Sequence, residues 1–311
     1  MKHPIDPKID CVFKALLGAQ ENRNLLVHFL NAVLATELGA PLSHVEILNP
    51  FNEKEFLDDK LSIVDVKAQD SLGGIYQIEI QLLGYRHLPA RIVYGWADIY
   101  TQQIRSGQSY DRLRPTYGIW ILAENLIPND GGYAHHYKLR DERGRTLLEH
   151  GGIWLLELEK FVAERIETEE QRWLKLFKEG GRLDEAALPD WMNTDEMRQA
   201  METLRKFSEK DLNYFAYQAR ENFLREQRTI AMELEEARQE REQARQELER
   251  IEREREQAER EREQAERERE QAERDLEQER LAWERSLTRE REEKDVALAE
   301  IERLKALLQQ R

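Results

Sequence analysis

Two acidic residues, Asp65 and Glu79, lie in neighbouring segments in which polar and apolar residues alternate. In residues 61–69 and 75–83, the polar side chains fall mainly on odd-numbered positions and the apolar ones on even-numbered positions. This alternation has the period of a β-strand. The intervening residues 70–74, DSLGG, favour a tight turn. The two segments are therefore predicted to form a β-hairpin with one carboxylate on each strand.

The parity of the apolar positions restricts how these two strands can pair. Both apolar faces are buried together only if opposite residue numbers have an even sum, because a slip of one residue would turn one strand inside out. A sum near 144 closes the turn and places Asp65 opposite Glu79. A slip of two residues would place Asp65 opposite Gln77 or Gln81, with Glu79 on the diagonal. In each case both carboxylates lie on one face of the sheet.

Two carboxylates side by side repel each other, and a hard divalent cation is the natural compensation. Mg²⁺ binds one or two carboxylates together with waters and phosphate oxygens. A metal in such a site lowers the pKa of a bound water and stabilises charge on a scissile phosphate. Lys67 and Gln81 flank the pair and could orient the water or bind the phosphate. The alternative is a set of solvated residues on an exposed hairpin face.

The elements that must position this hairpin follow from the hydrophobic periodicity. Helices are predicted at 8–17, 22–38 and 89–105, and strands at 45–48, 116–122, 131–140 and 153–158. Residues 164–227 are predicted to be helical, with interruptions at Gly180-Gly181 and Pro189. The order helix, three strands, helix, strand predicts an α/β domain built on a mixed sheet.

Composition divides the chain into two parts and limits the functions it can have. Residues 1–227 hold 28 basic and 36 acidic residues, and residues 228–311 hold 20 and 27, so both parts are acidic. Nucleic-acid binding usually needs a basic surface, which a bound cation and a locally basic groove would have to replace. The single cysteine excludes an intrachain disulfide and a cysteine-based zinc site. The polar N-terminus and the lack of a long apolar run predict a cytoplasmic protein without a membrane segment.

A wider set of motifs surrounds the two carboxylates. It comprises Asp10-x-x-Phe13-Lys14, Val64-Asp65-Val66-Lys67-Ala68-x-Asp70, Tyr76-Gln77-Ile78-Glu79-Ile80-Gln81, Arg91-x-x-Tyr94, Gln103, Gly107, Tyr110 and Pro115. In this order the motifs resemble the Rpn family of recombination-promoting nucleases, also described as transposases of the PD-(D/E)XK superfamily. The resemblance covers residues 5–125 and continues weakly into residues 197–222.

The resemblance implies a PD-(D/E)XK restriction-endonuclease-like core and Mg²⁺-dependent cleavage of DNA, tied to recombination or mobile elements. Mn²⁺ is the alternative ion. Asp65 and Glu79 match the metal ligands, and Gln81 matches the third motif position. Most of the superfamily has a lysine at that third position. Lys67 lies on the same predicted face, and we expect it to supply the missing positive charge.

Four further polar residues are candidates for accessory roles. Asp10 and Lys14 are four residues apart, so they share one helical face. They could contribute to the metal site or form a simple ion pair with each other, and the sequence is compatible with both roles. Arg91 and Gln103 follow the hairpin and could face phosphate, with structural roles equally open.

The C-terminal part carries a seven-residue repeat, REREQAE, three times in residues 253–273. Alanine recurs once per heptad, but the partner positions 241, 255, 262 and 269 are arginine, whereas a stable coiled coil needs two apolar positions. Glu256–Arg260 and Glu263–Arg267 have the spacing of stabilising ion pairs. We expect a solvated helix that self-associates weakly, giving a homo-oligomer. A short dimerising patch is predicted at Leu298, Ile301, Leu304 and Leu308.

These observations predict three regions: a nuclease-like domain at 1–163, a helical extension at 164–227 and a Glu/Arg-rich helix at 228–311. The leading hypothesis is a Mg²⁺-dependent endodeoxyribonuclease. The alternative is an inactive nuclease-like scaffold whose helix mediates oligomerisation or partner recruitment. An RNA nuclease is a third possibility. Cleavage of a plasmid would separate the first two, and a panel of substrates would separate DNA from RNA.

Overall fold

The computed structural model describes residues 3–48, 65–184 and 187–309. Its contacts divide the chain into two compact units, residues 1–229 and residues 230–311, and each unit is described by itself. Residues 61–64, which begin the first predicted hairpin strand, lie outside the described residues. None of the helices in the described ranges is long and apolar enough to span a membrane.

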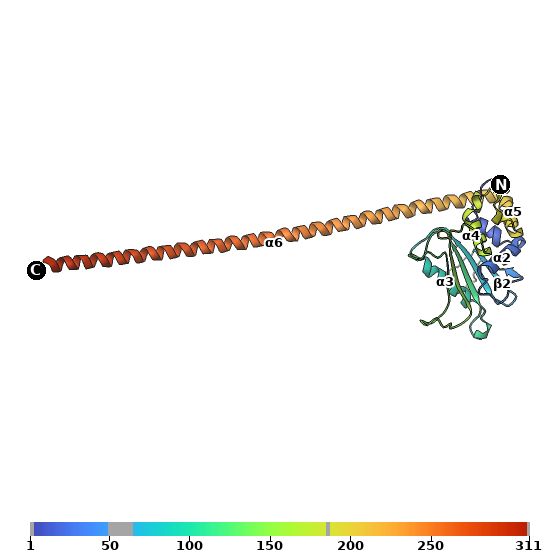
Figure 1. Ribbon diagram of the computed structural model, residues 1–311, viewed down its shortest axis with the longest axis horizontal. Helices are drawn as coiled ribbons and strands as arrows, with labels where there is room; N and C mark the ends of the chain where they lie inside the picture. The colour runs from blue at the N-terminus through green and yellow to red at the C-terminus, as the bar shows by residue number, and fades with distance from the viewer. Residues whose placement is uncertain (1–2, 49–64, 185–186, 310–311) are drawn as a thin grey trace. The chain divides into compact units, whose positions relative to one another are not determined.

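The first unit is built on a sheet of six strands (Figure 1). The strands are β1 (Val45–Ile47), β2 (Val66–Asp70), β3 (Ile75–Gln81), β4 (Thr116–Leu122), β5 (Ala134–Tyr137) and β6 (Gly151–Glu157). Their order across the sheet is β1-β2-β3-β4-β6-β5. Strands β3, β4 and β6 are parallel, and the remaining neighbours are antiparallel. The prediction of a mixed sheet is confirmed.

The hairpin of β2 and β3 has the register that the parity of its apolar positions favours. Val66 pairs with Ile78, and Ala68 pairs with Tyr76, so opposite residue numbers sum to 144. Asp65 immediately precedes the first paired residue of β2 and is therefore next in line with Glu79. Burial of the apolar even-numbered side chains fixes this register.

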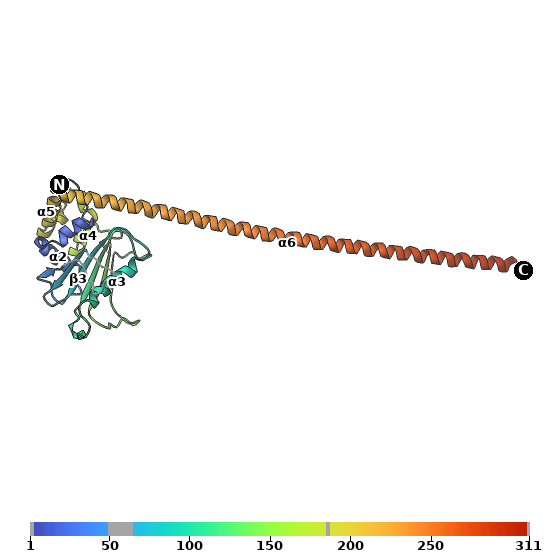
Figure 2. The same ribbon diagram turned by 180° about the vertical axis from the view of Figure 1, so that it is seen from behind.

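Four helices cover one face of the sheet (Figures 1 and 2). They are α1 (Asp10–Leu17), α2 (Arg23–Val33), α4 (Glu169–Glu179) and α5 (Asp195–Glu209). Their apolar stripes pack in one core with Tyr76, Ile78, Ile119 and Trp154. The caps of two of these helices are side chains, because Thr168 accepts from the N–H of Gln171 and Thr194 from that of Met197. α2 ends five residues before the predicted boundary at 38.

Helix α3 (Leu88–Thr101) covers the opposite face of the sheet. Its Leu88 and Ile92 pack with Trp120 of β4 and Leu155 of β6. The odd-numbered residues of β3 lie on this same face, and they include Glu79. The polar face of the hairpin is therefore continued by an apolar surface on β4 and β6, and a helix lies over both.

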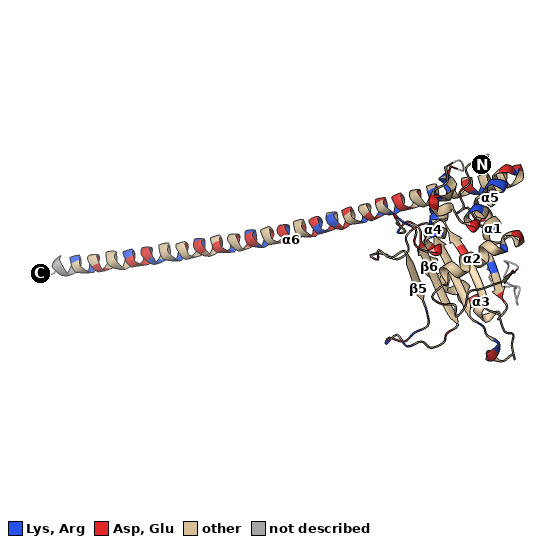
Figure 3. Ribbon diagram, turned by 45° about the vertical axis from the view of Figure 1, so that its right-hand side comes forward, with Lys and Arg blue, Asp and Glu red and all other residues tan. Residues whose placement is uncertain are grey.

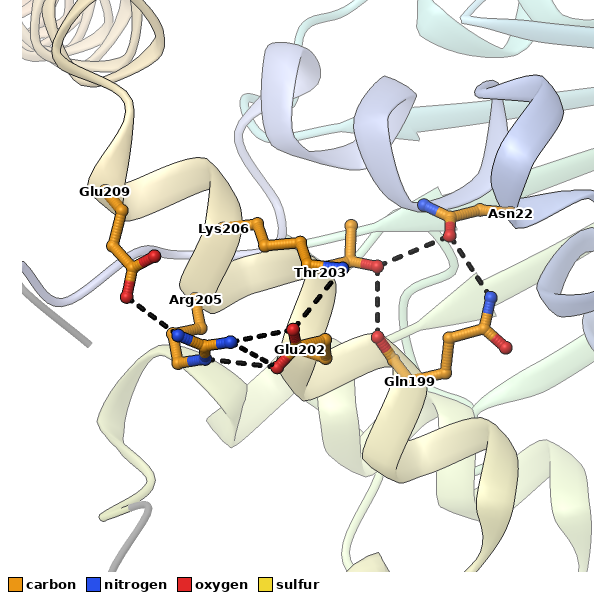
Figure 4. Close-up of polar contacts among 7 residues, drawn as sticks. All are labelled: Asn22, Gln199, Glu202, Thr203, Arg205, Lys206 and Glu209. Carbon is orange, nitrogen blue, oxygen red and sulfur yellow. Dashed lines mark hydrogen bonds and ion pairs between the residues drawn. The ribbon is translucent and has the colours of Figure 1, made fainter.

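A polar cluster attaches α5 to the short helix η1 (Gln20–Asn22) (Figure 4). The Oδ1 atom of buried Asn22 accepts hydrogen bonds from Gln199 Nε2 at 3.2 Å and from Thr203 Oγ1 at 3.4 Å. Asn22 Nδ2 donates to the carbonyl of Ala15 at 2.8 Å. On the same helix, Arg205 bridges Glu202 and Glu209. The bonds from Gln199 and Thr203 to Asn22 join the predicted helical extension to the N-terminal helices.

Short helices also occur in two connecting segments: η2 (Tyr110–Arg112) precedes β4, and η3 (Gly180–Arg182) and η5 (Asp190–Met192) lie between α4 and α5.

Helix α6 (Asp211–Gln309) begins in the first unit and forms the described part of the second. Within the first unit, Tyr217 and Leu224 are buried, and the hydroxyl of Tyr217 accepts from the N–H of Asp6. In the second unit the charged side chains of both signs are interspersed along the helix (Figure 3). Arg260 lies 3.5 Å from Glu256 and Arg267 lies 3.2 Å from Glu263, which confirms these predicted ion pairs.

Candidate active site

Asp65 is held at the start of β2 by two donors from different elements. Its Oδ2 accepts from the backbone N–H of Ile80 on β3 at 3.0 Å. Its Oδ1 lies 3.3 Å from Nζ of Lys14 on α1. The side chain is 15% exposed, so one part of the carboxylate still reaches solvent. The hairpin partner strand and the first helix together fix where this carboxylate points.

Glu79 lies near the end of β3, on the face that α3 covers. It is only 4% exposed. Its Oε1 accepts a hydrogen bond from Nε2 of Gln77 at 3.0 Å. The sequence left open an exposed, solvated hairpin face, and burial of Glu79 shows that this alternative is wrong. Burying a carboxylate without a compensating charge is unfavourable, so the fold maintains this group against a free-energy penalty.

Burial and mutual repulsion change the ionisation of both carboxyl groups. Burial, followed by the negative charge of Asp65, raises the pKa of Glu79 to about 8. Burial also raises the pKa of Asp65, against the hydrogen bond from Ile80 and the charge of Lys14. The two groups therefore lie within electrostatic reach of each other, in a place that favours a bound positive charge.

Gln81 is the last residue of β3, and both polar atoms of its amide form hydrogen bonds. Its Nε2 donates to the carbonyl of Leu83 at 2.7 Å, and its Oε1 accepts from Arg91 at 3.2 Å. The same Arg91 nitrogen donates to the hydroxyl of Tyr85 at 3.1 Å. The guanidinium also lies 5.6 Å from the ring centroid of Trp120, a cation–π distance. Arg91 is exposed and is held beside Gln81 by three different groups.

The charge of Arg91 also reaches the buried carboxylate. It lowers the pKa of Glu79, although by less than burial and Asp65 raise it. The sequence left a phosphate-facing role and a structural role open for Arg91. The structure places Arg91 next to Gln81, the third motif position. Sequence reasoning did not identify Tyr85 or Trp120 as its supports, since neither has a chemical signature in the sequence.

Lys14 and Asp10 form ion pairs with different partners. Lys14 pairs with Asp65 across elements, whereas Asp10 Oδ2 lies 3.2 Å from Nε of Arg220 on α6. The simple pair between residues 10 and 14 is thus not the contact that these side chains make. Asp10 still acts on the site through space, because its charge is one of the influences that raise the pKa of Asp65.

The sequence left phosphate contact and a structural role open for Gln103, and its contacts are structural. Its Nε2 donates to the carbonyl of Arg114 and to Oγ1 of Thr116, and its Oε1 accepts from the N–H of Arg114. Thr116 pairs with the first residue of β3, at the opposite end of that strand from Glu79 and Gln81. Gln103 therefore fixes the loop that enters β4.

Lys67 is half-buried on β2, opposite Gln77 in the hairpin. It lies two residues after Asp65, so the two side chains leave the strand on the same face.

The donor set fits a divalent ion bound by two carboxylates. Within the described ranges, no group of three or more histidine, cysteine or acidic side chains is placed to hold a metal. Mg²⁺ does not need one, because it keeps several waters and takes phosphate oxygens from its substrate. Asp65 and Glu79, each with a raised pKa, are the residues that would hold it.

Comparison with known proteins agrees with this fold. The family model of the PD-(D/E)XK nuclease family transposases matches residues 7–234, well over half of the chain. No curated protein matches the chain, and no solved structure does. The mixed sheet flanked by helices is the α/β core that the resemblance implied. The chain belongs to the PD-(D/E)XK nuclease family transposases.

Proposed function

We propose that this protein is a metal-dependent DNA endonuclease that acts in recombination or on mobile elements. The observation that carries the proposal is the proximity of Asp65, directly before β2, to buried Glu79 on β3, each with a raised pKa. A structural role alone gives no reason to place two repelling carboxyl groups there. A binding site for Mg²⁺ or Mn²⁺ gives such a reason.

Asp65 and Glu79 are the proposed ligands of this ion. When bound, the metal supplies an activated water and stabilises negative charge on the phosphate. The protein positions the two carboxylates. The backbone N–H of Ile80 and the ammonium group of Lys14 hold Asp65, and the amide of Gln77 holds Glu79. Lys14 and Lys67 add positive charge on the α1 and β2 side of the site.

Arg91 is the proposed phosphate-binding residue. Its guanidinium is exposed, yet Gln81, Tyr85 and Trp120 fix its position. A guanidinium matches the oxygens of a phosphate group well. A local cation of this kind answers the difficulty that the first unit as a whole is acidic. Most of the superfamily has a lysine at the motif position of Gln81. In this proposal Gln81 instead positions Arg91, which supplies the positive charge.

Plasmid nicking tests the proposal directly. The full chain is incubated with supercoiled plasmid and Mg²⁺, beside Asp65→Asn, Glu79→Gln and the control Glu142→Gln, whose side chain is exposed. We expect nicking by the wild type and the control, and loss of at least 100-fold in the two site variants. Nicking that is equal in all four preparations would show a contaminant and remove the enzymatic proposal.

The second candidate function is an inactive nuclease-like scaffold. The acidic balance of both parts of the chain and the long ion-paired helix α6 favour it. Absence of nicking by well-folded wild-type protein, on DNA and RNA substrates and with either Mg²⁺ or Mn²⁺, would support the scaffold. Cleavage of RNA but not of DNA would instead identify a ribonuclease that uses the same carboxylates.

A further inference from the structure

Gln77 is a buried amide next to the proposed metal ligand Glu79. It is 1% exposed and lies in the middle of the sheet, opposite Lys67 on β2 and Gly118 on β4. Its Nε2 donates to Oε1 of Glu79 at 3.0 Å. Its own Oε1 is buried and has no hydrogen-bond partner among the described residues.

The unpartnered oxygen shows that Gln77 is not optimised for stability. A buried amide oxygen without a donor destabilises the folded state. An apolar side chain of similar length, such as methionine, would fill the same space without this defect. What glutamine adds is the N–H group that points at Glu79, and the hydrogen bond to Glu79 is therefore the property that distinguishes it.

Two glycines leave space for the amide group. A Cβ atom at Gly95 of α3 would lie 3.3 Å from Nε2 of Gln77, which is a tight contact. A Cβ atom at Gly118 of β4 would lie 3.9 Å from Oε1. The distance at Gly118 is an ordinary van der Waals contact, whereas at Gly95 the helix approaches the amide so closely that a side chain would crowd it.

Gln77 is also the donor that fixes Glu79. Among the described residues, the one hydrogen bond to the Glu79 carboxylate comes from Gln77. That bond engages Oε1 and determines how the carboxylate plane is turned. Asp65, by contrast, is held by the N–H of Ile80 and by Lys14, so it does not depend on the amide.

We propose that Gln77 is a positioning residue that holds the Glu79 carboxylate in the orientation needed to bind the divalent ion. This inference rests on the proposed function. Groups that orient a metal ligand from behind typically contribute 10- to 100-fold to metal affinity. Gln77 acts through Glu79, and the missing side chain at Gly95 leaves room for its amide.

Direct binding of Mn²⁺ to the full chain, followed by electron paramagnetic resonance without DNA, tests the inference. Gln77→Met is expected to weaken Mn²⁺ binding about 10-fold or more. The matched control is Gln69→Met, because Gln69 lies on the adjacent strand and donates to the carbonyl of Gly73 rather than to a carboxylate. The control should bind Mn²⁺ as the wild type does. Wild-type affinity in folded Gln77→Met would overturn the inference.

A second variant keeps the test decisive if Gln77→Met does not fold. Gly95→Ala retains the amide but pushes a methyl group against its Nε2, and it should also weaken Mn²⁺ binding. In that case, wild-type affinity in Gly95→Ala overturns the inference. Asp65→Asn and Glu79→Gln separate the two proposals. If the wild type binds no Mn²⁺, or if these two variants bind it equally well, the metal site itself is wrong. If Asp65→Asn and Glu79→Gln lose Mn²⁺ binding but Gln77→Met binds Mn²⁺ as the wild type does, only the inference about Gln77 fails.

Discussion

Glu79 lies in an environment unlike that of an ordinary glutamate on a strand. Burial and the charge of Asp65 raise its pKa to about 8, from an ordinary value of 4.5. Its proton is therefore retained by the folded protein at neutral pH and released by the unfolded chain. A divalent ion bound at the proposed site would replace that proton.

This difference in proton binding makes stability depend on pH. Between about pH 4.5 and pH 8 the folded state binds the Glu79 proton and the unfolded state does not, so the free energy of unfolding falls as pH rises. Above about pH 8 the contribution of Glu79 is lost. Glu79→Gln stays neutral in both states, and we expect it to reduce the slope in this window. Thermal unfolding in a metal chelator, from pH 5 to pH 9, measures it.

The exposed variant Glu142→Gln provides the comparison for this titration, because it removes one carboxylate without removing a buried one. It should keep the wild-type slope. An unchanged slope in Glu79→Gln would mean that Glu79 is already ionised in the folded protein at neutral pH. The electrostatic argument for a cation would then lose its basis.

At the scale of the elements, the hairpin was the most predictable part of the site. Parity of the apolar positions is enough to fix the register, since a wrong register exposes a whole apolar face. Burial of its polar face was not predictable in the same way. Alternation shows that Glu79 and Gln81 share a side of the strand, but it does not show that α3 covers that side. Only the packing of Leu88 and Ile92 on β4 and β6 reveals it.

Glu157 marks a second point that periodicity could not identify. It ends the apolar strand β6 and is fully buried. Its carboxylate accepts from the backbone N–H groups of Leu126 and Ile127, from His135 and from Lys160. The sequence shows a strand ending in an acid. It does not show that the long loop between β4 and β5 folds back to meet that acid.

Removing this charge should destabilise the first unit. Burial opposes ionisation of Glu157, but the hydrogen bonds from Lys160, Ile127, Leu126 and His135 outweigh it and lower its pKa. Glu157→Gln leaves the half-buried Lys160 ammonium without its counter-charge, and we expect a loss of about 3 kcal/mol of unfolding free energy at pH 7. Urea denaturation measures the loss. The exposed neighbour Glu159→Gln should change stability by less than about 0.5 kcal/mol, and an equal loss in both variants would contradict the role of Glu157.

At the scale of the whole molecule, the difference in unfolding free energy between the wild type and Glu157→Gln should shrink in acid. Because the pKa of Glu157 is lowered, its contribution is present above the ordinary value of 4.5 and is lost as pH falls through the lower, folded-state value. Glu79 has the opposite sign, since its contribution is lost as pH rises. The two buried acids therefore limit stability from opposite ends of the pH range, and neither limit follows from net charge alone.

The second unit is a helix that carries ion pairs between its own side chains. Its ion pairs are exposed and span one helical turn, and each contributes about 0.2–0.5 kcal/mol. Arginine at positions 241, 255, 262 and 269 opposes a continuous coiled coil. Apolar side chains reappear near the C-terminal end, where Leu298, Ile301 and Leu304 are all about half exposed. We propose that this end mediates weak homo-oligomerisation.

Sedimentation velocity of the full chain over a range of concentrations tests this proposal. Leu298→Glu combined with Ile301→Glu should weaken self-association at least 10-fold, because it places acidic groups on the apolar face that two copies would share. Leu248→Glu changes an equally exposed leucine in the same heptad register as Arg241 and Arg255, just before the REREQAE repeats, and should have a smaller effect. A larger effect of Leu248→Glu would move the interface into the heptads. Sedimentation as a monomer at every concentration would show that the helix serves as a spacer or binds a different partner.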